Sequence, residues 1–177
     1  RLLVATGSNP FILPIPGKDL EGVIAYRDIA DTNAMIDAAA KYQRAVVIGG
    51  GLLGLEAANG LMKRGMQVSV IHVMPTLMER QLDVVAGKML QKSLEERGMR
   101  FIMGGQTQAL IGDKDGGKSG RVMALQFKDG TEIPTDLVVM AVGIRPNTEL
   151  AEKMRLHCNR GIVVNDTLQT VTDARIY

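Results

Sequence analysis

Apolar residues in the first hundred positions gather into short runs that alternate with longer segments of helical spacing. The runs at 44–48, 67–73 and 100–103 are rich in β-branched residues, which is typical of buried strands. The segments at 52–64 and 82–97 repeat apolar residues every three or four positions, as one face of a helix does. This alternation predicts a parallel sheet with helical crossovers.

The period changes in the second half of the chain. Segments 107–111, 121–128 and 131–134 alternate apolar and polar residues, and Asp129-Gly130 is a strong hairpin signal, so we predict antiparallel strands here. The apolar run 136–142 is expected to return to the parallel sheet. We therefore predict an α/β fold, with a Rossmann-like parallel sheet carrying helices on both faces and a three-stranded antiparallel β-meander.

The N-terminal region combines extended and proline-rich segments. Residues 1–8 predict a short buried strand that runs into a glycine turn. The prolines between positions 9 and 17 exclude a helix or a central strand there. Apolar spacing then predicts a helix over about 28–41. The proline-rich segment is our candidate linker between two domains.

Three glycines follow the first β-branched run with the spacing G-x-G-x-x-G of a dinucleotide-binding turn: Gly49, Gly51 and Gly54. In such a turn the first glycine allows a sharp exit from the strand, the second leaves room for the pyrophosphate, and the third lets the helix pack closely on the sheet. Leu52 and Leu53 begin that helix, whose first N–H groups and positive dipole end favour an anion. The alternative is a turn shaped by packing alone, with no ligand.

Charge and cysteine content exclude several classes of protein. The 21 basic and 19 acidic residues give a net charge of +2, and neither sign is clustered, so we expect no nucleic-acid and no membrane partner. Cys158 is the only cysteine, which excludes an internal disulfide and a C-x-x-C redox pair and fits a reducing, cytoplasmic compartment. No nucleophile–base pair or metal-ligand cluster is apparent, so we assign no catalytic side chain and no metal site.

Three motifs, in this order, resemble those of the FAD-dependent pyridine nucleotide reductases with two dinucleotide-binding domains. They are Ala-Thr-Gly at 5–7, Gly-Gly-Gly-Leu-Leu-Gly-Leu-Glu at 49–56, and Val-Gly-Ile-Arg-Pro-Asn at 142–147. In that family the first and third motifs are the crossings between an FAD domain and an NAD(P)H domain inserted into it. Further segments are similar to the large subunits of assimilatory NAD(P)H-dependent nitrite reductases: 23–31, 49–60, 78–83 and 156–166.

The resemblance implies a division of the chain and a set of cofactors. Residues 27–142 would be the NAD(P)H-binding domain, and 1–26 with 143–177 would be partial segments of the FAD-binding domain. We expect the chain to be a fragment that does not reduce nitrite by itself. The full-length protein would use NAD(P)H, FAD, siroheme and a [4Fe-4S] cluster, and its partners would be the rest of the FAD domain, downstream redox domains and a small subunit.

The resemblance also implies roles for residues near the cofactors. It places the Glu56 carboxylate opposite the nicotinamide, although an acid here could merely favour the helix dipole. Gly143 would let the backbone approach the nicotinamide end, since ligands lie at the carboxyl ends of parallel strands, although a plain turn glycine is the alternative. Thr6 and Gly7 would face the flavin. The chemistry implied is hydride transfer from nicotinamide C4 to flavin N5.

The expected dinucleotide depends on the end of the second strand. An NAD-selective site normally carries an acidic residue there, whereas this chain has His72. Neutral His72 can hydrogen-bond a ribose hydroxyl, and Arg80 can reach a 2′-phosphate, with Glu79 partly offsetting its charge. We therefore predict that NADH is preferred by a modest margin and that NADPH is also accepted.

Two other functions fit the same pattern. One is a rubredoxin or ferredoxin reductase of the same family, which would pass electrons to a small carrier protein. The other, from a different class, is a noncatalytic module that binds or senses NAD(H). The downstream gene sequence would distinguish them, because cysteine clusters for iron–sulfur and siroheme centres belong only to the nitrite reductases.

Overall fold

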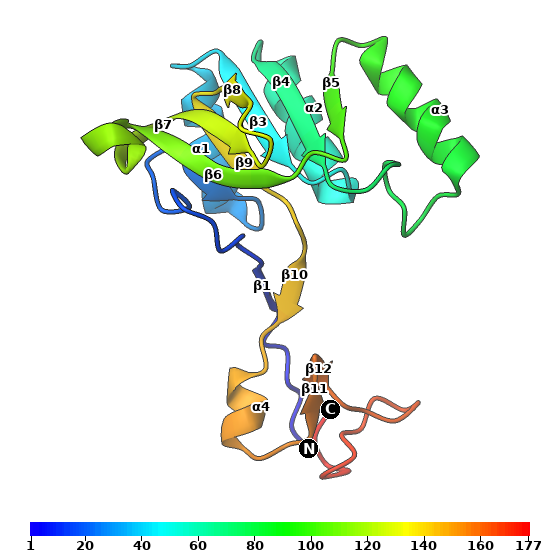
Figure 1. Cartoon of the computed structure of the whole chain (residues 1–177). Helices are drawn as coiled ribbons and strands as arrows, with labels where there is room; N and C mark the ends of the chain where they lie inside the picture. The colour runs from blue at the N-terminus through cyan, green and yellow to red at the C-terminus, as the bar shows by residue number, and fades with distance from the viewer. The chain divides into compact units, whose positions relative to one another are not determined.

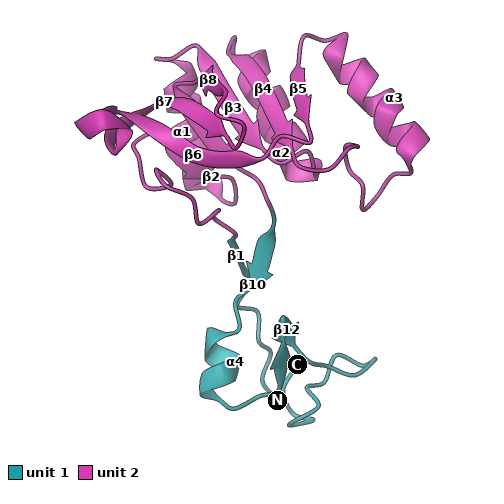
Figure 2. Cartoon of the chain, viewed as in Figure 1, with its two compact units in different colours: residues 1–10, 143–177 teal, residues 11–142 magenta.

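The computed structural model describes all 177 residues and divides them into two compact units, residues 1–10 with 143–177 and residues 11–142 (Figure 2). We predicted an inserted domain over 27–142, so the larger unit begins earlier than expected. Residues 11–26 belong to it because strand β2 (Val23–Ala25) pairs with the central sheet. In addition, the Leu110 N–H donates to the Pro16 carbonyl at 2.9 Å.

Five parallel strands form the central sheet of the larger unit, in the order β2-β9-β3-β4-β5 (Figure 1). Three α-helices belong to this unit, and β4 follows β3 through helix α2 while β5 follows β4 through helix α3. The strands and helices are β3 (Arg44–Ile48), β4 (Gln67–His72), β5 (Arg100–Met103), β9 (Leu137–Met140), α1 (Ile29–Ala39), α2 (Leu52–Lys63) and α3 (Val84–Glu95). Each predicted strand and helix of this part is present, with ends that differ by one or two residues.

The two faces of the sheet are covered differently, which corrects the prediction of helices on both faces. Side chains alternate across a strand, so Val47 and Val139 lie in one buried cluster while Val46 and Val138 lie in the other. The first cluster is completed by residues of all three helices, and the second by residues of the antiparallel strands. The strands are apolar on both sides and therefore could not indicate which element covers which face.

The antiparallel sheet has the predicted meander order β6-β7-β8. Its strands are β6 (Thr107–Lys114), β7 (Ser119–Phe127) and β8 (Glu132–Pro134), so β6 and β7 extend into the interval 112–120 that separates the predicted strand segments. Only a 3-10 turn, Asp115–Gly117, remains between them. Leu110, Val122 and Leu125 of this sheet are at most 2% exposed, because they pack on the parallel sheet.

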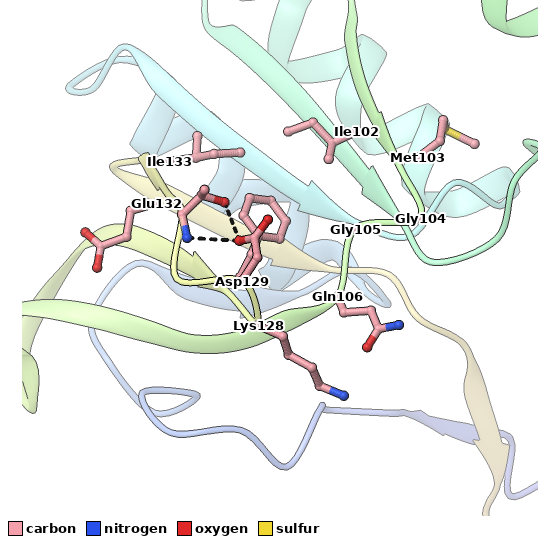
Figure 3. Close-up of a pocket in the computed structure, with 11 residues that line it drawn as sticks. Ile102, Met103, Gly104, Gly105, Gln106, Lys128, Asp129, Glu132 and Ile133 are labelled. Carbon is pink, nitrogen blue, oxygen red and sulfur yellow. Dashed lines mark hydrogen bonds between the residues drawn. The ribbon is translucent and has the colours of Figure 1, made fainter.

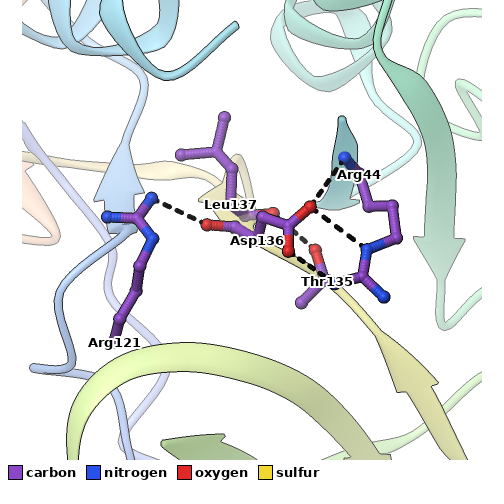
Figure 4. Close-up of polar contacts among 5 residues, drawn as sticks. All are labelled: Arg44, Arg121, Thr135, Asp136 and Leu137. Carbon is purple, nitrogen blue, oxygen red and sulfur yellow. Dashed lines mark hydrogen bonds and ion pairs between the residues drawn. The ribbon is translucent and has the colours of Figure 1, made fainter. Parts of the chain in front are cut away.

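An ion pair fastens the amino ends of β3 and β9 (Figure 4). The Asp136 carboxylate accepts hydrogen bonds from the Arg44 backbone N–H at 3.0 Å and from its guanidinium at 3.1 and 2.6 Å. The Arg44 guanidinium holds the pKa of the Asp136 carboxyl below its usual range, against partial burial, which raises it. Arg121 of β7 donates to the Asp136 carbonyl at 2.9 Å and stacks on the Tyr42 ring. These polar contacts therefore stabilise the sheet at the amino ends of β3 and β9.

The smaller unit consists of short elements. Strand β1 (Ser8–Pro10) pairs with β10 (Ile144–Pro146), helix α4 (Glu149–Lys153) follows, and β11 (Cys158–Asn159) pairs with β12 (Gly161–Ile162). The buried strand predicted over residues 1–8 is wrong: Leu3 is 76% exposed, and Leu2 forms only an isolated bridge with Ile176. A short apolar run becomes a buried strand only where neighbouring strands cover it.

Candidate functional site

The glycine-rich turn lies at the carboxyl end of β3, between β3 and helix α2. From β3 the chain proceeds through β4 to β5 on one side, and it returns to β9 on the other side of β3. The order of connections therefore reverses between β3 and β9. In open parallel sheets, ligands bind outside the carboxyl ends of the strands at such a switch point. The fold thus brings the turn to the place where a ligand is expected.

Two glycines of the turn have no room for a side chain. Gly49 has φ +123°, and a methyl group added there would lie 2.2 Å from the Ala141 carbonyl oxygen at the end of β9. A methyl group at Gly54 would lie 1.9 Å from the Gly49 carbonyl oxygen. The first glycine therefore lets β3 turn beside β9, and the second lets α2 approach the turn. Both requirements are internal to the protein and would hold without a ligand.

Gly51 differs from these two glycines because the protein leaves the space beside it empty. Its φ is −85°, and no atom lies within 4 Å of a methyl group added there. It is also the N-cap of α2, and no side chain caps the helix. The first N–H groups of a helix lack intrahelical partners, and the helix dipole favours negative charge beside them. The empty space beside Gly51 and the first N–H groups of α2 together suit the binding of a pyrophosphate.

The other predicted site residues of the larger unit differ in their exposure to solvent. Leu52 and Leu53 begin α2 and are 56% and 38% exposed. Glu56 is exposed and lies in the second turn of α2 rather than the first, so a simple effect on the helix dipole is weaker there. Arg80 is exposed in the segment after β4. His72, the last residue of β4, is only 7% exposed.

Both ring nitrogens of His72 already have protein partners. The Gly50 N–H donates to Nδ1 at 3.1 Å, and Nε2 lies 3.0 Å from Glu79 Oε2. A direct bond from His72 to a ribose hydroxyl would displace one of these partners. From the sequence we considered Glu79 only as an offset to the charge of Arg80. The contact with His72 gave no sequence signal, because Glu79 follows His72 by seven residues in an irregular segment.

The remaining predicted residues belong to the smaller unit. The Thr6 hydroxyl donates to the Asn147 carbonyl at 2.7 Å, and the Asn147 N–H donates to the Gly7 carbonyl at 2.9 Å. These bonds join the two segments of chain that cross between the units. Gly7 has φ +68° and Gly143 has φ +119°, conformations that favour glycine, and no atom lies within 4 Å of a methyl group at either position.

A separate open pocket of about 610 Å³ lies between the segment after β5 and the β7–β8 hairpin (Figure 3). Gly104, Gln106 and Lys128 are among its lining residues, and no residue of the glycine turn lines it. Asp129 accepts hydrogen bonds from the Thr131 hydroxyl and N–H, which lower the pKa of its carboxyl. The pocket shows no convergent chemistry, so its size alone does not make it the better site.

Comparison with known proteins shows the family of this chain. A family model described as pyridine nucleotide-disulphide oxidoreductase matches residues 1–177. The chain belongs to this family.

Two relatives from Bacillus subtilis are similar to this chain. Nitrite reductase [NAD(P)H] is 59% identical over 170 residues, which is 96% of this chain and 20% of the relative. The assimilatory nitrate reductase electron transfer subunit is 48% identical over 177 residues, which is 100% of this chain and 22% of the relative. The chain thus spans about a fifth of the length of these relatives.

A solved structure shares the same fold. The crystal structure of a ferredoxin reductase from Rhodopseudomonas palustris superimposes with a TM-score of 0.90 at 29% sequence identity, covering 99% of this chain and 42% of that protein. None of the chain's helices has the length and apolar character needed to cross a membrane.

Proposed function

We propose that the chain binds NADH on the Gly49–Gly54 turn, accepts NADPH less well, and presents the nicotinamide to a flavin. The observation that carries this proposal is the contrast among the three glycines. Gly49 and Gly54 are required by the protein's own packing, whereas the space at Gly51 beside an uncapped helix is used by nothing in the protein. A bound pyrophosphate would occupy that space and accept hydrogen bonds from the first N–H groups of α2.

The chain's residues would bind and orient the cofactors, because in such enzymes the cofactors themselves react. FAD, when bound, would accept the hydride from the nicotinamide. Glu56, Leu52 and Leu53 are exposed on the first two turns of α2, where they can contact the dinucleotide beyond its pyrophosphate. We assign Thr6 and Gly7 to the flavin side and Gly143 to the nicotinamide end. The bond from the Thr6 hydroxyl to the Asn147 carbonyl joins the two segments that carry Gly7 and Gly143.

For the whole protein we propose reduction of nitrite to ammonia. The support is the similarity to the Bacillus subtilis nitrite reductase over 96% of this chain. Siroheme and a [4Fe-4S] cluster would then be held outside the matched segment, since Cys158 alone cannot ligate a cluster. The partners would be the rest of the FAD domain, downstream redox domains and a small subunit. A chain with one cysteine also suits a reducing cytoplasm.

A second candidate is an electron-carrier reductase of the same family. The structural match to a ferredoxin reductase, with a TM-score of 0.90, favours it. Both candidates use the same dinucleotide site and differ only in where the flavin sends its electrons.

Replacing Gly51 tests the site itself. The Gly51→Val side chain would enter the space needed by the pyrophosphate and displace it from several N–H donors. Each hydrogen bond to a charged group is worth about 1.5–3 kcal/mol, so we expect NADH affinity to fall by about a hundredfold or more. Titration calorimetry with NADH measures this change in affinity.

The matched control is Gly60→Val, in the same helix. Gly60 is exposed, and a methyl group there also meets nothing within 4 Å. This variant should bind NADH like the unaltered chain. Equal NADH affinity in the Gly51 and Gly60 variants would remove the turn as the binding site.

A further inference from the structure

The end of β4 carries a fixed pair of side chains rather than a single acidic residue. A backbone N–H can only donate, so the bond from Gly50 requires that His72 Nδ1 carries no hydrogen. The ring hydrogen of neutral His72 is therefore on Nε2, and it is donated to Glu79 Oε2 at 3.0 Å. His72 thus links the glycine turn to the Glu79 carboxylate and keeps no nitrogen for a ligand.

The segment after β4 is folded back onto the turn, which is how a distant residue reaches this place. The Met78 N–H donates to the Gly50 carbonyl at 3.1 Å, so Gly50 is bound through both its N–H and its carbonyl. A methyl group at Gly50 would lie 2.7 Å from both the His72 ring and the Leu77 side chain. Leu77 is fully buried. The two hydrogen bonds of Gly50, one to Met78 and one to His72, therefore hold the segment that carries Glu79 beside the glycine turn.

The Glu79 carboxylate is both charged and accessible. Its side chain is 30% exposed. Partial burial raises the pKa of the Glu79 carboxyl, but bonds from its own backbone N–H and from His72 outweigh this and lower it, so the group is ionised at neutral pH. A carboxylate has about four acceptor sites, and the bonds from His72 and from the Glu79 backbone N–H use two of them. The others can accept a hydrogen bond from a ligand.

We propose that Glu79, positioned by His72, accepts the hydrogen bond of the adenosine ribose 2′-hydroxyl and disfavours a 2′-phosphate. Glu79 would thereby replace the acidic residue that the end of this strand usually carries. The inference rests on the proposed binding of NADH at the turn and names the residue that selects between NADH and NADPH. Arg80 is exposed beside Glu79, and its positive charge contributes to lowering the pKa of the Glu79 carboxyl, but it makes none of the hydrogen bonds that join Gly50, His72 and Glu79.

Three adenosine-half ligands separate the possible roles of Glu79: ADP-ribose, its 2′-deoxy form and its 2′-phosphate form. A hydrogen bond to a charged acceptor is worth about tenfold or more in affinity. The unaltered chain should therefore bind ADP-ribose about tenfold tighter than the 2′-deoxy form, and the 2′-phosphate form should bind weakest. Titration calorimetry on the intact chain gives all three affinities.

In Glu79→Gln the side-chain oxygen can still accept from His72, so the network is preserved while the charge is lost. We expect the preference for ADP-ribose over the 2′-phosphate form to fall by about tenfold, with tighter binding of the 2′-phosphate form. His72→Asn places an oxygen near the position of Nδ1 and removes the bond to Glu79. The preference of His72→Asn for ADP-ribose over the 2′-phosphate form should lie between the preference of the unaltered chain and that of Glu79→Gln.

Glu96→Gln is the charge-matched control, because Glu96 is exposed at the C-cap of α3. It should leave every preference unchanged. The proposal is overturned if Glu79→Gln keeps the unaltered preferences, or if it weakens all three ligands by the same factor, as a purely structural role would. A folded, unaltered chain that binds no ADP-ribose would instead contradict the proposed function, and with it this inference.

Discussion

At the scale of single residues, the glycines of the turn have different physical tasks that their shared spacing conceals. Gly51 faces empty space, whereas Gly54 touches the backbone of Gly49 so closely that a methyl group would lie 1.9 Å from its carbonyl oxygen. A substitution at Gly54 should therefore affect folding, and one at Gly51 should affect binding.

Gly54→Ala should lower the free energy of unfolding by about 3 kcal/mol, at the upper end of the usual cost of overpacking, because the obstacle is backbone and cannot rotate away. Gly60→Ala in the same helix meets open space and should raise it by about 0.5–1 kcal/mol. Urea denaturation of both variants measures the difference. Similar stabilities for the two would show that α2 does not pack on the turn as described.

Residue types alone could predict the turn but not the His72–Glu79 pair. The G-x-G-x-x-G spacing predicts the conformation of the turn directly, since strand, turn and helix are consecutive in the sequence. The Glu79 contact instead depends on how an irregular segment folds back, with Met78 at φ +51° and its N–H bonded to Gly50. Such a conformation for a non-glycine residue leaves no periodic signal in a sequence.

At the scale of elements, the polar network at the amino ends of β3 and β9 is expected to stabilise the sheet in a pH-dependent way. Asp136→Asn keeps one acceptor but loses the charge that pairs with Arg44. Arg44 is 44% exposed, so solvent screens this pair. The free energy of unfolding at pH 7 should fall by about 1–2 kcal/mol.

The pKa of Asp136 gives the direction of the pH dependence. Because the folded-state pKa is lowered below the ordinary value of 3.8, the contribution is complete above that value and is lost as the pH falls through the lowered pKa. The stability difference between the unaltered chain and Asp136→Asn should therefore shrink below pH 3.8. Denaturation curves at pH 7 and pH 3 provide the measurement. Asp37→Asn, an exposed change on α1, is the control, and a difference that persists at low pH would contradict the account.

The strands and helices of the parallel sheet were predictable because each has a regular spacing of apolar residues and a residue that marks where the element begins or ends. Asp83, for example, caps α3 by accepting from the Ala86 N–H, and such a cap residue marks a helix start. The covering of the two faces was not predictable, because strands buried on both sides show no alternation. The strand expected over residues 1–8 failed for a related reason: the apolar character of Leu2 and Leu3 does not reveal whether a partner covers them.

At the scale of the whole molecule, the chain combines a larger unit, which carries the proposed dinucleotide site, with a smaller unit of short elements. The larger unit contains two buried clusters, one on each face of its sheet, and the site lies at the end of the central strand β3. The relatives are about five times longer than the matched segment, since it covers 20% of the nitrite reductase. Any final electron acceptor would therefore depend on the longer protein, whereas we assign the proposed dinucleotide site to residues 11–142.

The most direct test of the central claim is the change in backbone amide chemical shifts when NADH is added to the ¹⁵N-labelled chain. A pyrophosphate on the turn would accept hydrogen bonds from the start of α2, so the largest changes should occur at Gly51, Leu52 and Leu53. The main competitor is the pocket beside β5, lined by Gly104 and Lys128. If the changes are confined to that pocket, or if none occurs in a folded chain, the glycine turn does not bind the dinucleotide.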